Sequence, residues 1–178
     1  MTTIAAVQLD DRVIIGADNQ TTSGIGRKYN PPQRVKISER GKYIIAGAGD
    51  VRACDIAQVL WNPPNPTAAD KKNLYHFMLR KVIPSLKDAL KDHDYKVDQN
   101  DNEAGFLLLV AVEGQVFEIA DDYSVTMSDH GIYAIGTGSS YAIGALFANA
   151  TITEALEIAA ANDVYTSGPY MIVEQYKN

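Results

Sequence analysis

The sequence has few of the features that mark secreted, membrane or nucleic-acid-binding proteins. Its 178 residues include one cysteine, Cys54, so an internal disulfide is excluded and a reducing compartment is favoured. No stretch approaches 18 consecutive apolar residues, which excludes a membrane-spanning helix. The formal net charge of −6 argues against nonspecific binding of nucleic acid. The first residues do not have the pattern of a secretory signal, and we expect a cytoplasmic protein.

Motifs for metal and phosphate chemistry are also scarce. The three histidines, His76, His93 and His130, have no metal-ligand spacing, and neither a Gly-x-Ser-x-Gly elbow nor a P-loop occurs. Gly136-Thr137-Gly138 lacks the third glycine and the lysine of a phosphate-binding loop. We therefore expect neither a metal ion nor a cofactor.

The composition that remains is typical of a globular protein. Hydrophobic residues make up 46% of the chain and charged residues 21%, and the length suits one domain with a sizeable core. No linker or internal repeat divides the sequence, so we expect a single domain over residues 1–178.

Apolar patterning predicts the order of the elements. Strands are expected at 3–9, 12–17, 34–38, 42–47, 105–112, 115–120 and 169–176, with further β structure at 124–127 and 131–136. The short polar or glycine-containing segments 10–11, 39–41 and 113–114 predict hairpins between the first three successive pairs of these strands. Helices are expected at 50–61, 67–93, 141–149 and 152–162. Two antiparallel sheets packed face to face, with helix pairs outside, would cover every apolar face. The fold class is therefore α+β.

Helix-capping and helix-breaking residues refine these bounds. Thr67 is the expected N-cap of the long helix, and Pro84 should kink or split it. Ser139 or Ser140 is expected to cap the third helix. Thr151 and Glu154 have the spacing of a capping box before the fourth.

Two threonines follow Met1, and Thr2 becomes a nucleophile with its own base once Met1 is removed. A small side chain at residue 2 favours removal of Met1 by an aminopeptidase. The freed α-amine, with a reference pKa of about 7.7–8.0, can accept the hydroxyl proton near neutral pH. Threonine is also common at the start of a strand, so this pair alone does not decide between catalysis and strand formation.

Longer motifs carry a family resemblance. The segment TTIAAVQLDDRVIIGADNQTTSG resembles the amino terminus of proteasome β subunits and of the bacterial HslV-type peptidase. The resemblance continues through KYIIAGAGD, IYAIGTGSSYAIGAL and DVYTSGP, and so covers nearly the whole chain. It implies the N-terminal nucleophile hydrolase fold, a four-layer αββα sandwich, and the activity of a threonine-type protease.

The resemblance assigns roles to five positions in the first half of the chain. Thr2 matches the nucleophile, and Asp18 matches the acid that orients the catalytic lysine. The backbone N–H of Gly47 would face the developing oxyanion. The resemblance also implies that Ile45 lines the pocket for the substrate side chain and that Thr22 pairs with an extended substrate.

The resemblance assigns roles to three further positions, and two of them have threonine where the family has serine. Thr137 stands in Gly-Thr-Gly where the family has serine, beside the terminal amine. Asp163 and Thr166 form the Asp-x-x-Ser element, with threonine in place of serine. Both replacements keep a hydroxyl donor and acceptor and add a methyl group.

The catalytic lysine has two candidates. Arg34-Val35 and Lys36-Ile37 both fit a basic residue followed by an aliphatic one, and residues two apart on a strand point to the same face. Lysine can carry or release a proton, whereas arginine stays charged. We therefore assign Lys36 to the slot, with Arg34 as the alternative.

Three functions are considered. The first is a threonine-type endopeptidase acting on peptides or unfolded proteins, with an ATP-dependent unfoldase left open as a partner. The second is a small-molecule amidase on the same fold. The third is an inactive structural subunit, for example of a phage particle. No nucleic-acid or membrane partner is expected.

A homo-oligomeric ring is expected from the apolar residues of the helices. They look too numerous for one inward face and so predict an interface: Leu74, Phe77, Met78, Val82, Ile83, Leu86, Ile143, Leu146 and Phe147.

Replacing each basic residue in turn tests the lysine assignment. We expect Lys36→Ala to lower hydrolysis of fluorogenic peptides by about 100-fold or more, as loss of a preorganised charge at a reacting centre does. Arg34→Ala should cost far less. Equal and mild losses from both substitutions would contradict the assignment and favour the structural subunit.

Overall fold

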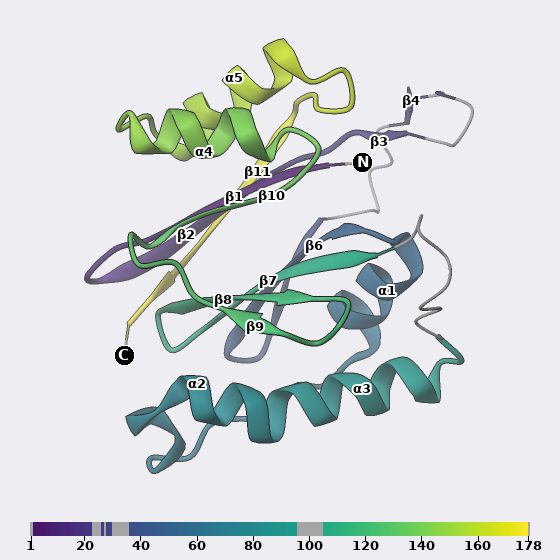
Figure 1. The fold of residues 1–178 in the computed structure, drawn as a ribbon, viewed down its shortest axis with the longest axis vertical. Helices are drawn as coiled ribbons and strands as arrows, with labels where there is room; N and C mark the ends of the chain where they lie inside the picture. The colour runs from purple at the N-terminus through teal and green to yellow at the C-terminus, as the bar shows by residue number, and fades with distance from the viewer. Residues whose placement is uncertain (1, 23–25, 27, 30–35, 96–104, 178) are drawn as a thin grey trace.

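The structure is a computed structural model that describes residues 2–22, 26, 28–29, 36–95 and 105–177. Two antiparallel sheets lie face to face, with helices covering both outer faces (Figure 1). The four-layer α+β arrangement predicted from the sequence is confirmed.

The first sheet contains both ends of the described chain. Its order is β10 (Ile132–Gly136), β1 (Thr3–Gln8), β2 (Arg12–Asp18) and β11 (Tyr170–Tyr176). The predicted hairpin between the first two strands forms, with Ile4 paired to Ala17. This pairing brings the start of β1 beside the end of β2, where two of the predicted site residues lie.

The second sheet has the order β5 (Ile37–Arg40), β6 (Tyr43–Gly49), β7 (Phe106–Val112), β8 (Gln115–Ala120) and β9 (Val125–Thr126). Every residue of β7 except Leu107 is buried, as expected for a continuous apolar run covered on both faces. The predicted hairpins of this sheet form as well.

A short two-stranded ladder lies outside both sheets. It pairs β3 (Thr21–Thr22) with β4 (Lys28–Tyr29). β3 leaves the end of β2 and passes over the end of the sandwich where β6 also ends (Figure 1).

Helices α4 (Ser139–Phe147) and α5 (Ile152–Asn162) cover the first sheet. The predicted capping box at Thr151 and Glu154 is present. The cap expected from Ser139 or Ser140 is wrong: Gly138 occupies the N-cap position without a side-chain bond, and both serines belong to the helix.

The helix predicted at 50–61 consists of α1 (Val51–Asp55) and a π-helical turn, η1 (Ile56–Leu60). The long helix predicted at 67–93 begins later than expected. Residues 67–72 contain only the 3₁₀ turn η2 (Asp70–Lys72), and the helix starts at α2 (Leu74–Phe77). Thr67 is therefore not its cap; Asn73 is, and its side chain accepts the His76 N–H.

The long helix continues through the π-helical η3 (Met78–Val82) into α3 (Ile83–Asp92). Pro84 lies in the first turn of α3. The helix is therefore not split at Pro84, and the local irregularity is the wider π turn just before this residue.

The six apolar residues that predicted an interface on the long helix do not form an exposed patch, because they pack into the core of this chain. Leu74, Phe77, Met78, Val82, Ile83 and Leu86 are all buried against the second sheet and α1. Leu146 of α4 is buried as well, whereas Phe147 is 54% exposed. Of the nine residues named for this interface, Phe147 in the α4–α5 layer is the one that remains largely exposed.

Close packing of α5 on β2 gives a prediction about stability. A Cβ at Gly16 would lie 2.7 Å from Ile172 Cδ1 and 3.0 Å from Leu156 Cδ1. We expect Gly16→Ala to lower the free energy of unfolding by about 1–3 kcal/mol, as overpacking does. Urea denaturation measures this change.

Gly144 in α4 provides the matched control, because nothing lies within 4 Å of the Cβ that alanine would add. Gly144→Ala should raise stability by up to about 1 kcal/mol through helix propensity. Equal effects from the two substitutions would show that α5 does not rest directly on the β2 backbone.

Candidate active site

Residues 2 and 3 are held by main-chain bonds from both neighbouring strands. Thr2 is 6% exposed, and its carbonyl accepts the Thr137 N–H at 2.8 Å, from the loop after β10. The Thr3 N–H donates to Asp18 Oδ1 at 2.9 Å, at the end of β2. These two bonds fix the position of the Thr2 backbone, and therefore the point from which its side chain projects.

Asp18 is the acceptor at the centre of this region. It is 2% exposed, and Oδ1 also accepts Lys36 Nζ at 2.6 Å. Oδ2 accepts the backbone N–H of Gln20 at 3.0 Å and, more weakly, that of Ser167 at 3.4 Å. The carboxylate thus joins β1, β2, the residue before β5 and the loop after α5.

The structure therefore places Lys36 in the position expected of the lysine oriented by Asp18. Its side chain is only 7% exposed, so the ion pair is largely removed from water. Arg34, the alternative candidate, lies outside the described residues.

The predicted residues Thr137, Asp163 and Thr166 meet in a hydroxyl network. Thr137 and Thr166 both donate to Asp163 Oδ2, at 2.7 and 2.6 Å. Each hydroxyl has one hydrogen, so the 2.5 Å contact between Thr3 Oγ1 and Thr166 Oγ1 must be a bond donated by Thr3. Burial alone raises the pKa of Asp163, but the bonds from Thr166 and Thr137 outweigh it and keep the pKa below its usual value.

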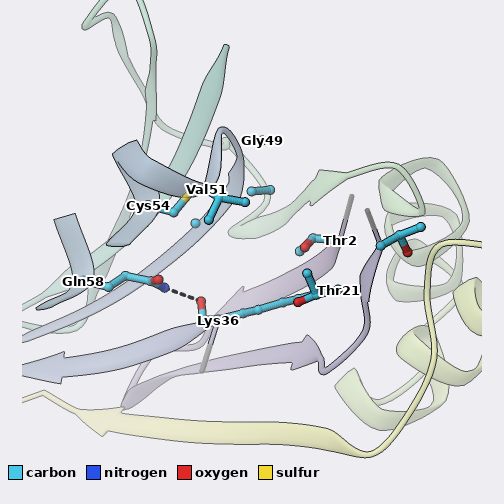
Figure 2. Close-up of a pocket in the computed structure, with 10 residues that line it drawn as sticks. Thr2, Thr21, Lys36, Gly49, Val51, Cys54 and Gln58 are labelled. Carbon is cyan, nitrogen blue, oxygen red and sulfur yellow. Dashed lines mark hydrogen bonds between the residues drawn. The ribbon is translucent and has the colours of Figure 1, made fainter. Parts of the chain in front are cut away.

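A small pocket opens beside Thr2 (Figure 2). Its lining includes Thr21 and Thr22 of β3 and Gly47 and Gly49 of β6. Its remaining lining includes Lys36, Val51, Cys54 and Gln58.

Ile45 does not line this pocket. It is fully buried, and its side chain belongs to the core between the second sheet and the helices. Cys54 and Gln58, which reach the pocket from α1 and η1, take the place expected for it.

The packing around Gly47 leaves no room for a side chain. A Cβ there would lie 2.7 Å from Cys54 Sγ and 3.1 Å from Leu108 Cδ2. Its N–H donates to the Lys36 carbonyl at 3.3 Å, which is long for an N–H···O bond. The Gly47 N–H, which the sequence predicts as the oxyanion donor, therefore makes only a weak bond to the Lys36 carbonyl.

A second opening lies on the other side of Thr2. It has a cavity volume of about 450 Å³ and is lined mainly by Phe106, Leu107, Asp121 and Thr137. Thr2 thus stands between two hollows, an arrangement that can accept a chain on both sides of the residue.

Two residues of the site gave little signal in the sequence. Thr3 follows Thr2 and has the residue type expected at the start of a strand, yet its hydroxyl donates to Thr166. Gln58 looks like an ordinary polar position of a short helix, although it reaches the pocket.

Within the part of the chain that the structure describes, no three His, Cys, Asp or Glu side chains are grouped to hold a metal ion. Over the same residues, no helix is both long and apolar enough to cross a membrane.

Comparison with known proteins gives a consistent result, although no protein-family model matches the chain. The chain is 25% identical over 182 residues to the ATP-dependent protease subunit HslV of Sulfurihydrogenibium sp. (strain YO3AOP1). The match covers 97% of this chain and 96% of that protein.

Solved structures agree in fold. Thiobacillus denitrificans BPH in complex with epoxomicin superimposes with a TM-score of 0.76 at 23% identity, covering 99% of both chains. Eukaryotic HslV from Trypanosoma brucei gives 0.68 at 20% identity, covering 97% of this chain and 98% of that one. The chain is thus similar to HslV over nearly its whole length, and it has the fold of the proteasome-type N-terminal nucleophile hydrolases.

Proposed function

We propose that the chain is a threonine-type endopeptidase in which Thr2, made N-terminal by removal of Met1, is the nucleophile. The observation that carries this proposal is the convergence of Asp18, Lys36 and the Asp163 network on residues 2 and 3. The relationship to a protease subunit supports the reaction class.

The reaction begins at the Thr2 hydroxyl. Its oxygen attacks the carbonyl carbon of the scissile peptide bond, and its proton passes to the α-amine of Thr2, directly or through one water. The Lys36 ammonium, held on Asp18, stabilises negative charge developing near the nucleophile. The amine then returns the proton to the leaving nitrogen as the C–N bond breaks, which leaves an ester on Thr2.

Hydrolysis of the ester completes the cycle. The α-amine takes a proton from water, the hydroxide equivalent attacks the ester carbonyl, and the Thr2 oxygen leaves with the proton. In both halves of the reaction the Gly47 N–H faces the oxyanion. The Gly47 N–H must therefore turn away from the Lys36 carbonyl. The free-energy cost of this turn is small, because the bond that it breaks is long, at 3.3 Å.

The substrate is proposed to be a peptide or unfolded protein lying extended beside β3 and β6. Thr22 and the backbone of Gly47–Gly49 offer main-chain partners on both sides of the pocket. The two hollows flanking Thr2 suit residues on either side of the cleaved bond.

Assembly into a homo-oligomeric ring is part of the same proposal. Large apolar side chains stay exposed over α4, α5 and the loop that follows: Tyr141, Phe147, Ile158 and Val164. Such a surface marks an interface. The matched relative is described as a subunit of an ATP-dependent protease, and on that basis we propose an unfoldase partner and a cytoplasmic location.

The two alternative functions gain no supporting observation. Nothing among the described residues favours a small-molecule amidase over a peptidase. An inactive structural subunit would need no ion pair between Lys36 and Asp18 next to Thr2, yet the pair is formed.

Replacing the nucleophile tests the proposal directly. Thr2→Ala should reduce peptide hydrolysis to background while leaving the unfolding midpoint close to that of the wild type. Thr2→Ser, which keeps the hydroxyl and the amine, is the matched control and should retain turnover. In intact-mass spectra, the wild type should lack Met1 and gain the mass of an added epoxyketone or β-lactone. Turnover by Thr2→Ala would move the nucleophile to Thr3 or Ser139.

Light scattering after size exclusion tests the ring. We expect a species many times heavier than the 19.4 kDa chain at micromolar concentration and neutral pH. Phe147→Asp should shift it toward smaller species, because a charge would enter the proposed interface. A wild-type protein that elutes cleanly as the single chain would rule the ring out.

A further inference from the structure

Gln58 is a buried polar side chain in the wall of the Thr2 pocket that the proposed reaction does not use. It lies in the π-helical turn η1, is 4% exposed, and approaches the pocket from the helix layer (Figure 2). π turns inside helices are frequent at functional sites. A buried amide in this position needs partners, and its partners show what it does.

Both partners of the Gln58 amide nitrogen are main-chain carbonyls. Nε2 donates to the Lys36 carbonyl at 2.5 Å and to that of Ile45 at 3.3 Å. An amide nitrogen has two hydrogens, and Gln58 donates both of them to these two backbone carbonyls. The shorter bond holds the residue whose ammonium pairs with Asp18.

Lys36 needs such a support because it lies just before β5. The ladder between β5 and β6 begins at Ile37, which pairs with Ala46. In the backbone of the described residues, the Lys36 carbonyl accepts a long bond from the Gly47 N–H. The side-chain bond from Gln58 is the shorter of these two bonds to the Lys36 carbonyl, and it ties Lys36 to the helical turn η1.

The same carbonyl links Gln58 to the oxyanion donor. Lys36 O accepts from Gln58 at 2.5 Å and from the Gly47 N–H at 3.3 Å. If the Gly47 N–H turns toward an oxyanion, the carbonyl still keeps the Gln58 donor. Without that donor, the turn would remove the second of the two described bonds to this carbonyl, and losing a bond at a buried carbonyl costs free energy.

We propose that Gln58 is a positioning residue of the active site. It fixes the Lys36 backbone so that Nζ stays on Asp18, and it satisfies the Lys36 carbonyl so that the Gly47 N–H is released to the substrate. The catalytic part of this inference rests on the proposed peptidase function.

Gln58→Leu removes both donors with little change in volume. We expect kcat to fall by about 10- to 100-fold, the size of loss that follows a small misplacement of reacting groups, with KM nearly unchanged. A loss that lies wholly in KM would show that Gln58 acts only as a wall of the pocket, and would overturn the proposal.

Ser38→Ala is the matched control. Ser38 Oγ donates to the Gln58 carbonyl at 2.9 Å, so this substitution removes another bond between the same strand and the same helical turn. It leaves the Gln58 side chain and the Lys36 carbonyl paired. We expect kcat to stay within about twofold of the wild type. An equal loss in both variants would assign the effect to general loosening of η1.

Gln58→Glu adds a readout that a purely structural role would not move. A protonated carboxyl can donate one bond to the Lys36 carbonyl, whereas the ionised form cannot donate. The activity of this variant relative to the wild type should therefore rise as pH falls, while the relative activity of Gln58→Leu stays flat. Parallel, flat profiles for both variants would overturn the proposal, and Gln58→Glu also serves if Gln58→Leu does not fold.

A crystal structure of either variant separates this inference from the proposed function. We expect the bond between Lys36 Nζ and Asp18 to be lost or lengthened. If that shift occurs in a protein whose wild type hydrolyses no peptide, the positioning role stands and the peptidase proposal fails. If the wild type is active and the ion pair is unchanged in an active variant, the positioning role fails alone.

Discussion

The buried carboxylate of Asp18 is the interaction on which the arrangement around Thr2 depends. It lies at the end of β2, yet its donors come from β1, from the residue before β5 and from the loop after α5. A buried carboxylate is tolerable only when its oxygens are well paired. The requirement to pair it therefore brings together segments from both sheets, at the end of the sandwich where Thr2 lies.

Asp163 is the acceptor of a second network, which holds the Thr3 side chain. Two threonine hydroxyls donate to one of its oxygens, and Thr3 is joined to them through Thr166. Because each hydroxyl has a single hydrogen, the direction of every bond in this chain is fixed. Short, directed bonds of this kind hold a chain end that would otherwise fray.

The helix layer contributes to the site through its packing. Cys54 fills the space that Gly47 leaves free, and Gln58 reaches two carbonyls of the second sheet. Both residues lie on the short helical segment formed by α1 and η1, whose position depends on the sheet against which it packs. A shift of this helix would move the pocket wall and the support of Lys36 together.

The sequence by itself determined the hairpins and the α5 capping box, because these follow from local turn chemistry and the period of the side chains. It also determined the candidates Thr2, Asp18 and Lys36, because the family motifs occur in the same order along this chain. Only the tertiary structure decided where the long helix begins, that its apolar face is internal, and that Gln58 rather than Ile45 reaches the pocket. Those outcomes depend on which surfaces meet across layers, and residues such as Gln58 and Lys36, 22 positions apart, form their bond only after the sheet and the helix have packed.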